Sequence, residues 1–128
     1  MEDYYWLASR KNATEKPLLP PPPPSSSTRD KDHIVDVVNN TIYFYSEVSR
    51  PKILELNKAI NNLSINLTNQ SNLLKMQTPG NIYLNINSFG GSVFAALSAV
   101  DTIQASDIPV CTLVEGCAAS AATLMSVV

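Results

Sequence analysis

An apolar stripe with helical spacing runs through the middle of the chain. Its residues recur at alternating spacings of three and four, and they are Ile53, Leu56, Ile60, Leu63 and Leu67. Such spacing places them on one face of an α-helix, which buries that face against the rest of a domain. Residues 49–51 (SRP) are typical of a helix start, because serine can cap a helix and proline fits its first turn. The polar residues 68–80 predict a connection after this helix.

Three shorter segments have the composition of β-strands. They are residues 41–45, 82–86 and 110–114, each rich in β-branched, aromatic or other apolar side chains. A second amphipathic helix is predicted over 93–103, between the last two strands. The order β-α-β-α-β predicts an α/β domain of repeated β-α-β units, with a mostly parallel sheet and helices packed against it. Ligands of such sheets bind beyond the carboxyl ends of the strands.

The first 32 residues differ in composition from the remainder. Residues 20–24 are all proline and three serines follow them, so this segment lacks the amide donors that helix and sheet need. We therefore expect residues 1–32 to be a disordered leader rich in proline and serine, and residues 33–128 to be the folded domain. The alternative is a ligand for a proline-reading domain or a docking arm, with the aromatic residues 4–6 as anchors.

Length and charge narrow the possible function classes. The chain has 128 residues, a formal net charge of −2 and 45% hydrophobic residues, which fits one domain with a tail. Its lysines and arginines are scattered, so no basic face for nucleic acid is predicted. A domain of this size buries roughly 60–65% of its unfolded surface, so we expect either association with further chains or missing downstream sequence.

Metal ions, cofactors and membranes are not predicted as partners. Cys111 and Cys117 lack the spacing of a metal motif, so we expect reduced thiols in the core. Residues 110–128 are apolar enough to raise the alternative of a membrane span, but a carboxylate at Glu115 would cost about 2.5–3.5 kcal/mol there. The N-terminus has no basic region followed by an apolar run, so it is not a secretory signal. We expect a cytoplasmic protein.

Two turns of small residues hold the candidate chemistry. Gly90 and Gly91 follow the second strand, where glycine lets a backbone amide approach a substrate carbonyl and stabilise an oxyanion. Ser120 follows the third strand among alanines that leave room for a substrate, as an exposed nucleophile requires. Each turn by itself is more typical of close packing with no ligand, and the pair of turns is more informative than either one. A phosphate loop is disfavoured because neither of the usual glycine-rich phosphate motifs is present.

Three stretches around these turns point to a known family. They are residues 85–93 (NINSFGGSV), 101–103 (DTI) and the run from 109–110 (PV) to 116–122 (GCAASAA). In this order they resemble the Clp protease proteolytic subunit, the ClpP family of serine peptidases. The resemblance extends from about residue 41 to the end of the sequence. It implies a ClpP/crotonase-like fold, of which this chain would hold the N-terminal half.

The resemblance also assigns roles to particular residues. It implies that Ser120 is the nucleophile and that Gly91 and Ala121 supply the amides of the oxyanion hole. Gly90, Ser92 and Val93 would border the cleft in which an extended peptide lies alongside the sheet.

The family pattern implies more than this sequence contains. The triad order in the family is Ser, His, Asp, and no histidine follows Ser120, so we expect the chain to be inactive unless a second chain supplies both residues. His33 would serve as a substitute base only if the leader lay over Ser120. The resemblance further implies a homo- or hetero-oligomeric ring, an AAA+ unfoldase as partner, and unfolded proteins as substrates of ATP-dependent degradation.

Two other functions remain open at this point. The first is a non-catalytic structural or regulatory subunit of such a ring, or an interaction protein that uses the proline arm. The second is a crotonase-type protein that binds an acyl thioester through the same pair of amides.

Overall fold

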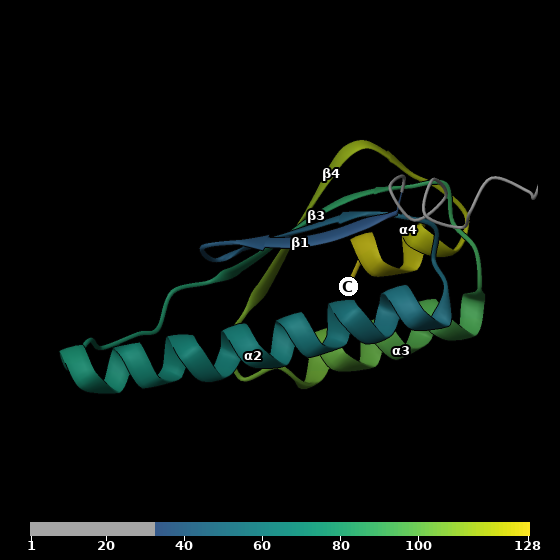
Figure 1. Cartoon of the computed structure of the whole chain (residues 1–128). Helices are drawn as coiled ribbons and strands as arrows, with labels where there is room; N and C mark the ends of the chain where they lie inside the picture. The colour runs from purple at the N-terminus through teal and green to yellow at the C-terminus, as the bar shows by residue number, and fades with distance from the viewer. Residues whose placement is uncertain (1–32) are drawn as a thin grey trace, which may run out of the picture.

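The computed structural model describes residues 33–128, which form one four-stranded sheet with helices against it (Figure 1). In chain order the elements are β1 (Ile34–Val38), β2 (Thr41–Tyr45), α2 (Arg50–Leu74), β3 (Ile82–Ser88), α3 (Val93–Ala105), β4 (Val110–Ala118) and α4 (Ala121–Ser126). The sheet order is β1-β2-β3-β4; β1 is antiparallel to β2, whereas β2, β3 and β4 are parallel. The predicted α/β class with a mostly parallel sheet is confirmed. The expected leader, residues 1–32, lies outside the described residues.

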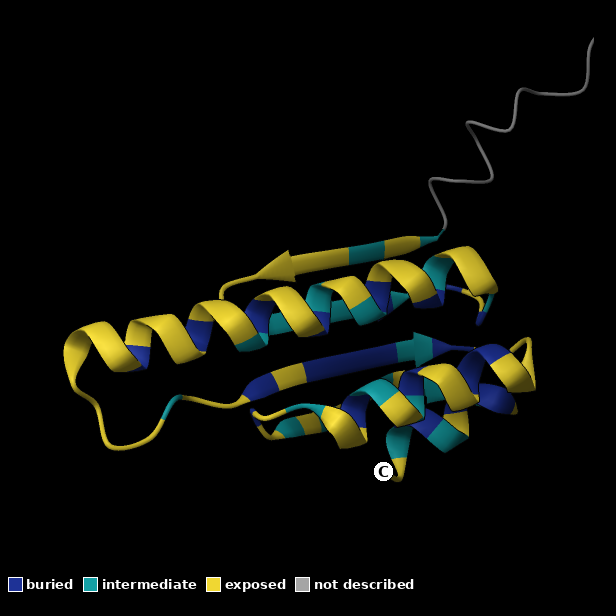
Figure 2. Cartoon of the chain, turned by 90° about the horizontal axis from the view of Figure 1, so that it is seen from below, coloured by how far each residue is buried: buried dark blue, intermediate teal, exposed yellow. Residues whose placement is uncertain are grey.

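The core lies between the sheet and the two longer helices. Helices α2 and α3 connect the parallel strands and lie on the same face of the sheet, below it in Figure 1. Alternate strand residues point to that face and are fully buried, namely Ile42, Phe44, Ile82, Leu84 and Ile86. They meet the predicted stripe of α2, which is buried along its length (Figure 2). Each large apolar side chain buried here contributes roughly 1.5–3 kcal/mol.

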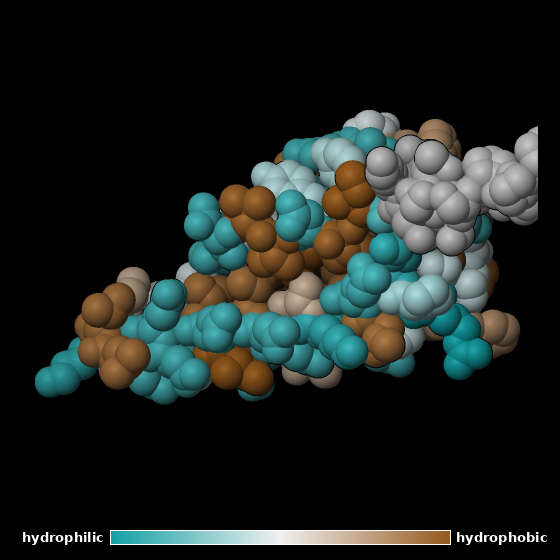
Figure 3. All heavy atoms as spheres, viewed as in Figure 1, coloured by the Kyte–Doolittle hydropathy of each residue, from teal (hydrophilic) through white to brown (hydrophobic). Residues whose placement is uncertain are grey.

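Helix α2 extends beyond its predicted end. The sequence predicts a connection over residues 68–80, but the helix continues through Leu74. The buried stripe continues from Leu67 to Ser71, one turn further, so tertiary packing holds residues whose local composition favours a loop. Lys75, with φ of 50°, then ends the helix in the left-handed conformation. Hydrophilic residues cover most of the outer side of the helix seen in Figure 3, and hydrophobic residues lie between it and the sheet. A few large apolar residues of α2 are nevertheless exposed, namely Leu54, Ile65, Leu73 and Leu74.

The strands also differ from the sequence-based expectation. Residues 34–38, not assigned to an element from the sequence, pair with β2 through a tight turn at Asn39, whose φ is 55°. Asparagine tolerates this left-handed conformation better than most residues. Strand β4 continues to Ala118 instead of ending at Val114, and β3 continues to Ser88. The second small-residue turn therefore comes after Ala118, four residues later than predicted.

Within residues 33–128, no helix is both long enough and apolar enough to cross a membrane. Residues 110–128, for which a membrane span was the alternative, form β4 and the short helix α4.

Candidate active site

The turn between β3 and α3 is held by hydrogen bonds from two sides. The hydroxyl of Ser88 accepts a bond from the amide of Gly90 (3.1 Å). On the other side, the amide of Val48 donates to the carbonyl of Gly90, and the amide of Ser92 donates to the carbonyl of Val48, each at 2.8 Å. Because these bonds pass on either side of Gly91, its own amide has no hydrogen-bond partner within residues 33–128. A free amide on a rigid turn is what an oxyanion donor requires.

Both glycines of this turn are required by close approach and by conformation. Gly91 has φ of 147°, and a Cβ atom there would collide with the carbonyl oxygen of Val48. Gly90 has φ of 109°, and a Cβ atom there would lie 2.7 Å from Cβ of Ser120 and 3.2 Å from the amide nitrogen of Ala121. The backbone of Gly90 therefore packs directly against the second turn.

Ser120 lies on the second turn, immediately before α4. Its φ of 52° and ψ of −125° fall in a region that residues with a Cβ atom rarely occupy. The side chain is exposed, and its Oγ has no hydrogen-bond partner in the described part of the chain. The amide of Ala119 donates to the carbonyl of Ser88 (3.0 Å), which joins this turn to the first one. The two predicted turns thus lie side by side at the carboxyl ends of the parallel strands.

The remaining predicted residues lie around this pair of turns. Ala121 is buried and is the first residue of α4, where an amide has no partner within the helix. Ser92 is the N-cap of α3, and its hydroxyl accepts a bond from the amide of Ala95 (3.3 Å). Val93 follows it and is half exposed. Gly90, Gly91, Ser92, Val93, Ser120 and Ala121 therefore all lie on or directly beside the two turns.

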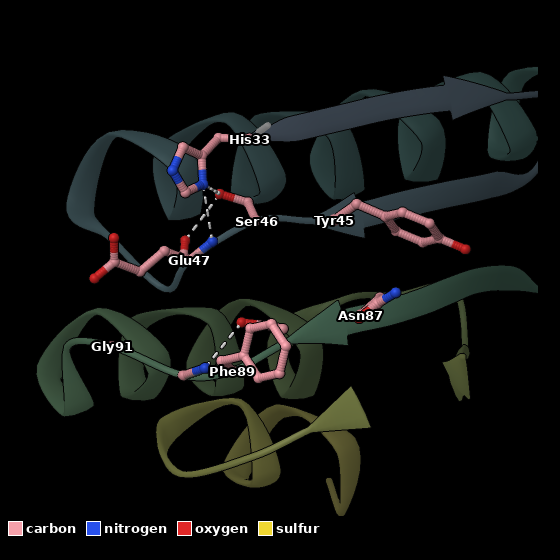
Figure 4. Close-up of a pocket in the computed structure, with 9 residues that line it drawn as sticks. His33, Tyr45, Ser46, Glu47, Asn87, Phe89 and Gly91 are labelled. Carbon is pink, nitrogen blue, oxygen red and sulfur yellow. Dashed lines mark hydrogen bonds between the residues drawn. The ribbon is translucent and has the colours of Figure 1, made fainter. Parts of the chain in front are cut away.

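His33 lies in a pocket on the other side of the first turn. The pocket has a volume of about 700 Å³, and its lining includes His33, Ser46, Phe89, Gly90 and Gly91 (Figure 4). Nδ1 of His33 accepts a bond from the amide of Glu47 (3.2 Å) and lies 3.3 Å from Oγ of Ser46. Ser120 does not line this pocket, and no hydrogen bond joins it to His33 among residues 33–128.

Both turns lie within the part of the chain that matches a known protein family. The family model described as Clp protease matches residues 37–128. The chain belongs to the Clp protease family. The family resemblance expected from residues 85–93 and 116–122 is therefore confirmed.

Among solved structures, the chain is similar to the ClpP1 N165D mutant from Listeria monocytogenes. The identity is 25% and the TM-score 0.49, over 68% of this chain and 44% of that protein. The chain therefore spans less than half the length of this Clp protease. A comparison with curated proteins found no match.

Two residues that hold the first turn of the candidate site were not identified from the sequence. Ser88 holds the first turn from within β3, and a serine two residues before a glycine is a known signal for a turn of this kind. Val48 holds the same turn from the far end of β2. No local pattern marks Val48, because its partners lie more than forty residues further along the chain.

The cysteines lie elsewhere than expected. Cys111 is exposed and Cys117 half-buried, both as free thiols, so the prediction that they belong to the core is wrong. They lie on the edge strand β4, whose residues are less covered than those of β3. In the described range 33–128, no group of three or more His, Cys, Asp or Glu side chains could hold a metal ion.

Proposed function

We propose that this chain provides the nucleophile and the oxyanion site of a ClpP-like serine endopeptidase. The observation that supports this best is the contact between Gly90 and Ser120, which places an exposed hydroxyl beside a glycine turn with a free amide. A turn that served packing alone would not need a serine in a strained backbone conformation.

In the proposed reaction, Oγ of Ser120 attacks the carbonyl carbon of a peptide bond and loses its proton to a base. The carbonyl oxygen becomes an oxyanion that accepts hydrogen bonds from the amides of Gly91 and Ala121. Collapse of this intermediate breaks the C–N bond, and the amine leaves with the proton. Water then hydrolyses the acyl-enzyme and restores the serine. Loss of one oxyanion donor typically costs about 3 kcal/mol of transition-state stabilisation.

The substrate would be an extended polypeptide. Gly90, Ser92 and Val93 would border its cleft, with the hydroxyl of Ser92 already used to cap α3. Recognition would therefore depend on backbone contacts along the glycine turn, a mode that accepts many sequences. Unfolded proteins fit this description better than a single defined peptide.

The base is the component that residues 33–128 do not place at Ser120. His33 is the single histidine of the sequence, and its Nδ1 is bonded to Glu47. The family pattern supplies a histidine and an aspartate, which would come from a segment or chain beyond these residues. Without a base the hydroxyl is a weak nucleophile, and only binding and oxyanion stabilisation would act.

Oligomeric ring assembly, an AAA+ unfoldase partner, ATP-dependent degradation and a cytoplasmic location belong to this proposal. Membership of the Clp protease family supports them. Strand β4 is an outer strand of the sheet in residues 33–128, and its Cys111 and Leu113 are exposed, which fits association with further polypeptide.

The test is covalent labelling of the purified chain with a fluorophosphonate probe, with and without added imidazole as a substitute base. We expect imidazole to promote labelling at Ser120 in the folded chain and not in the chain unfolded in urea. Ser120→Ala should abolish the labelled peptide, whereas Ser126→Ala, a change of a serine within α4, should retain it.

The outcome distinguishes the two functions that fit the family. Labelling that survives Ser120→Ala, or that is equal in urea, would refute Ser120 as the nucleophile. A folded chain that is not labelled with imidazole, yet co-purifies with active subunits, would instead be a non-catalytic subunit.

A further inference from the structure

A carboxylate joins the three parallel strands next to the candidate site. Glu115 of β4 accepts a hydrogen bond from the hydroxyl of Tyr45 on β2 through Oε2. Its Oε1 accepts a second bond from Nδ2 of Asn85 on β3 (2.9 Å). Within residues 33–128 the only ion pair is Lys52–Glu55 on α2. Glu115 is therefore held by neutral donors and not by a cation. Bonds to a charged acceptor are roughly twice as strong as neutral ones.

This carboxylate lies at the start of an irregularity in β4. Ile86 pairs with Val114, and the next pair is Ser88 with Ala118, so residues 115–117 span the stretch that Asn87 alone spans on β3. Gly116, in the middle, has φ of 87°, and a Cβ atom there would lie 3.3 Å from Nδ2 of Asn87. Such a bulge bends a strand and changes the direction of the residues after it.

The residues after the bulge are those of the candidate site. Once Ala118 has paired with Ser88, the amide of Ala119 donates to the carbonyl of Ser88, and Ser120 follows against Gly90. The position of Ser120 relative to the glycine turn therefore depends on where the bulge begins. Glu115 is the first residue of the bulge, and its two bonds connect it to β2 and β3.

We propose that Glu115 is a positioning residue, which holds the bulge of β4 against Tyr45 and Asn85 and thereby sets Ser120 beside Gly90. This inference rests on the proposed function insofar as it concerns reactivity at Ser120. The effect on the geometry of the turn does not depend on that function.

The protonation of the Tyr45 phenol agrees with its role as a hydrogen-bond donor to Glu115. Its hydrogen bond to Glu115 raises the pKa of Tyr45 above the usual 10.0, and burial, the charge of Glu115 and the neighbouring Tyr43 act in the same direction. The ring of Tyr43 lies edge-on to that of Tyr45, with centroids 6.2 Å apart, which orients the phenol. Tyr45 therefore remains a neutral donor to Glu115 throughout the neutral pH range.

The experiment compares Glu115→Leu, Glu115→Gln and the matched control Glu55→Gln, an exposed glutamate on α2. In Glu115→Leu we expect amide exchange of residues 116–120 to accelerate at least about tenfold, because two charge-assisted bonds are lost. Labelling of Ser120 should slow by a similar factor. Glutamine can still accept from Asn85 and bond to Tyr45, so Glu115→Gln should restore most of both quantities, and Glu55→Gln should change neither.

A second measurement follows the network itself. The absorbance titration of Tyr45, obtained by subtracting that of Tyr45→Phe, should move to lower pH in Glu115→Leu and stay unchanged in Glu55→Gln.

The outcomes separate this inference from the proposed function. If the wild-type chain is never labelled at Ser120, the peptidase proposal fails, and amide exchange alone decides the positioning role. Exchange that accelerates evenly over β2, β3 and β4, or that leaves 116–120 unchanged in Glu115→Leu, overturns the inference. Equal loss of labelling in Glu115→Leu and Glu115→Gln also overturns the inference. Glutamine keeps the hydrogen bonds to Tyr45 and Asn85, so it should keep Ser120 in position if these bonds set it.

Discussion

The two turns of the candidate site are both rich in small residues, but they are held in different ways. The first, residues 88–92, is bonded on one side to the hydroxyl of Ser88 and on the other to both backbone groups of Val48. The second, residues 118–121, follows a bulge and places Ser120 in a strained conformation, with Ala119 bonded to the first turn.

This difference indicates a division of tasks. A donor of hydrogen bonds to an oxyanion works best when it does not reorganise during the reaction, which suits the doubly held glycine turn. A nucleophile must project from the surface, and a strained turn exposes it at a cost of about 1–3 kcal/mol. The surrounding structure maintains that strain, so the second turn depends on the first for its position.

The largest expected effect comes from breaking the first turn at Gly91. The new Cβ atom in Gly91→Ala would collide with the backbone of Val48, and φ of 147° is unfavourable for alanine. We expect the free energy of unfolding to fall by more than about 3 kcal/mol, because neither backbone can move without losing the bonds of the turn. Urea denaturation followed by circular dichroism measures this change.

Gly80→Ala is the matched control for that substitution. A Cβ atom at Gly80 would meet only the side-chain amide of Asn40, at 3.3 Å, and that group can move. Its stability should change by less than about 1 kcal/mol. If both variants unfold at the same urea concentration, the first turn is not the rigid support inferred here.

A smaller effect is expected at Ser88, which holds the same turn through a side chain. Ser88→Ala removes the acceptor for the amide of Gly90 in a buried site and should cost about 1–2 kcal/mol. Ser64→Ala, a serine on α2, should change stability by less than about 0.5 kcal/mol. Thermal unfolding of the two variants measures this difference. If the stability of Ser88→Ala equals that of the wild type, Val48 alone supports the turn.

Much of the fold could be predicted from local patterns. The spacing from Ile53 to Leu67 defined the buried face of α2, since periodicity directly reflects which side chains face the core. The end of that helix could not be predicted, because residues 69–72 are polar and favour a loop by themselves. The buried contact of Ser71 with the rest of the domain outweighs that preference.

The candidate site was predictable to the extent that topology alone determines it. The carboxyl ends of parallel strands meet at one end of the sheet, so the two turns were expected to lie together, and Gly90 does pack against Ser120. The supports of the two turns were not predictable, since Val48 and Glu115 bond to residues that are distant in the sequence. Only the register between strands reveals them, and register is a property of the folded chain.

The smallest effect should come from the second turn and should have the opposite sign. Lys75, which is also at positive φ, has ψ of 38° in the ordinary left-handed region. Ser120 has ψ of −125°, where glycine is strongly preferred. Ser120→Gly relieves about 1–3 kcal/mol of strain but adds about 0.5–1 kcal/mol of chain entropy cost, so we expect a net gain of about 1 kcal/mol. Ser120→Ala keeps the Cβ atom and should match the wild type within about 0.5 kcal/mol. Equal stability of the glycine and alanine variants would mean that the turn is relaxed, and the contrast with the first turn would then reduce to hydrogen bonding alone.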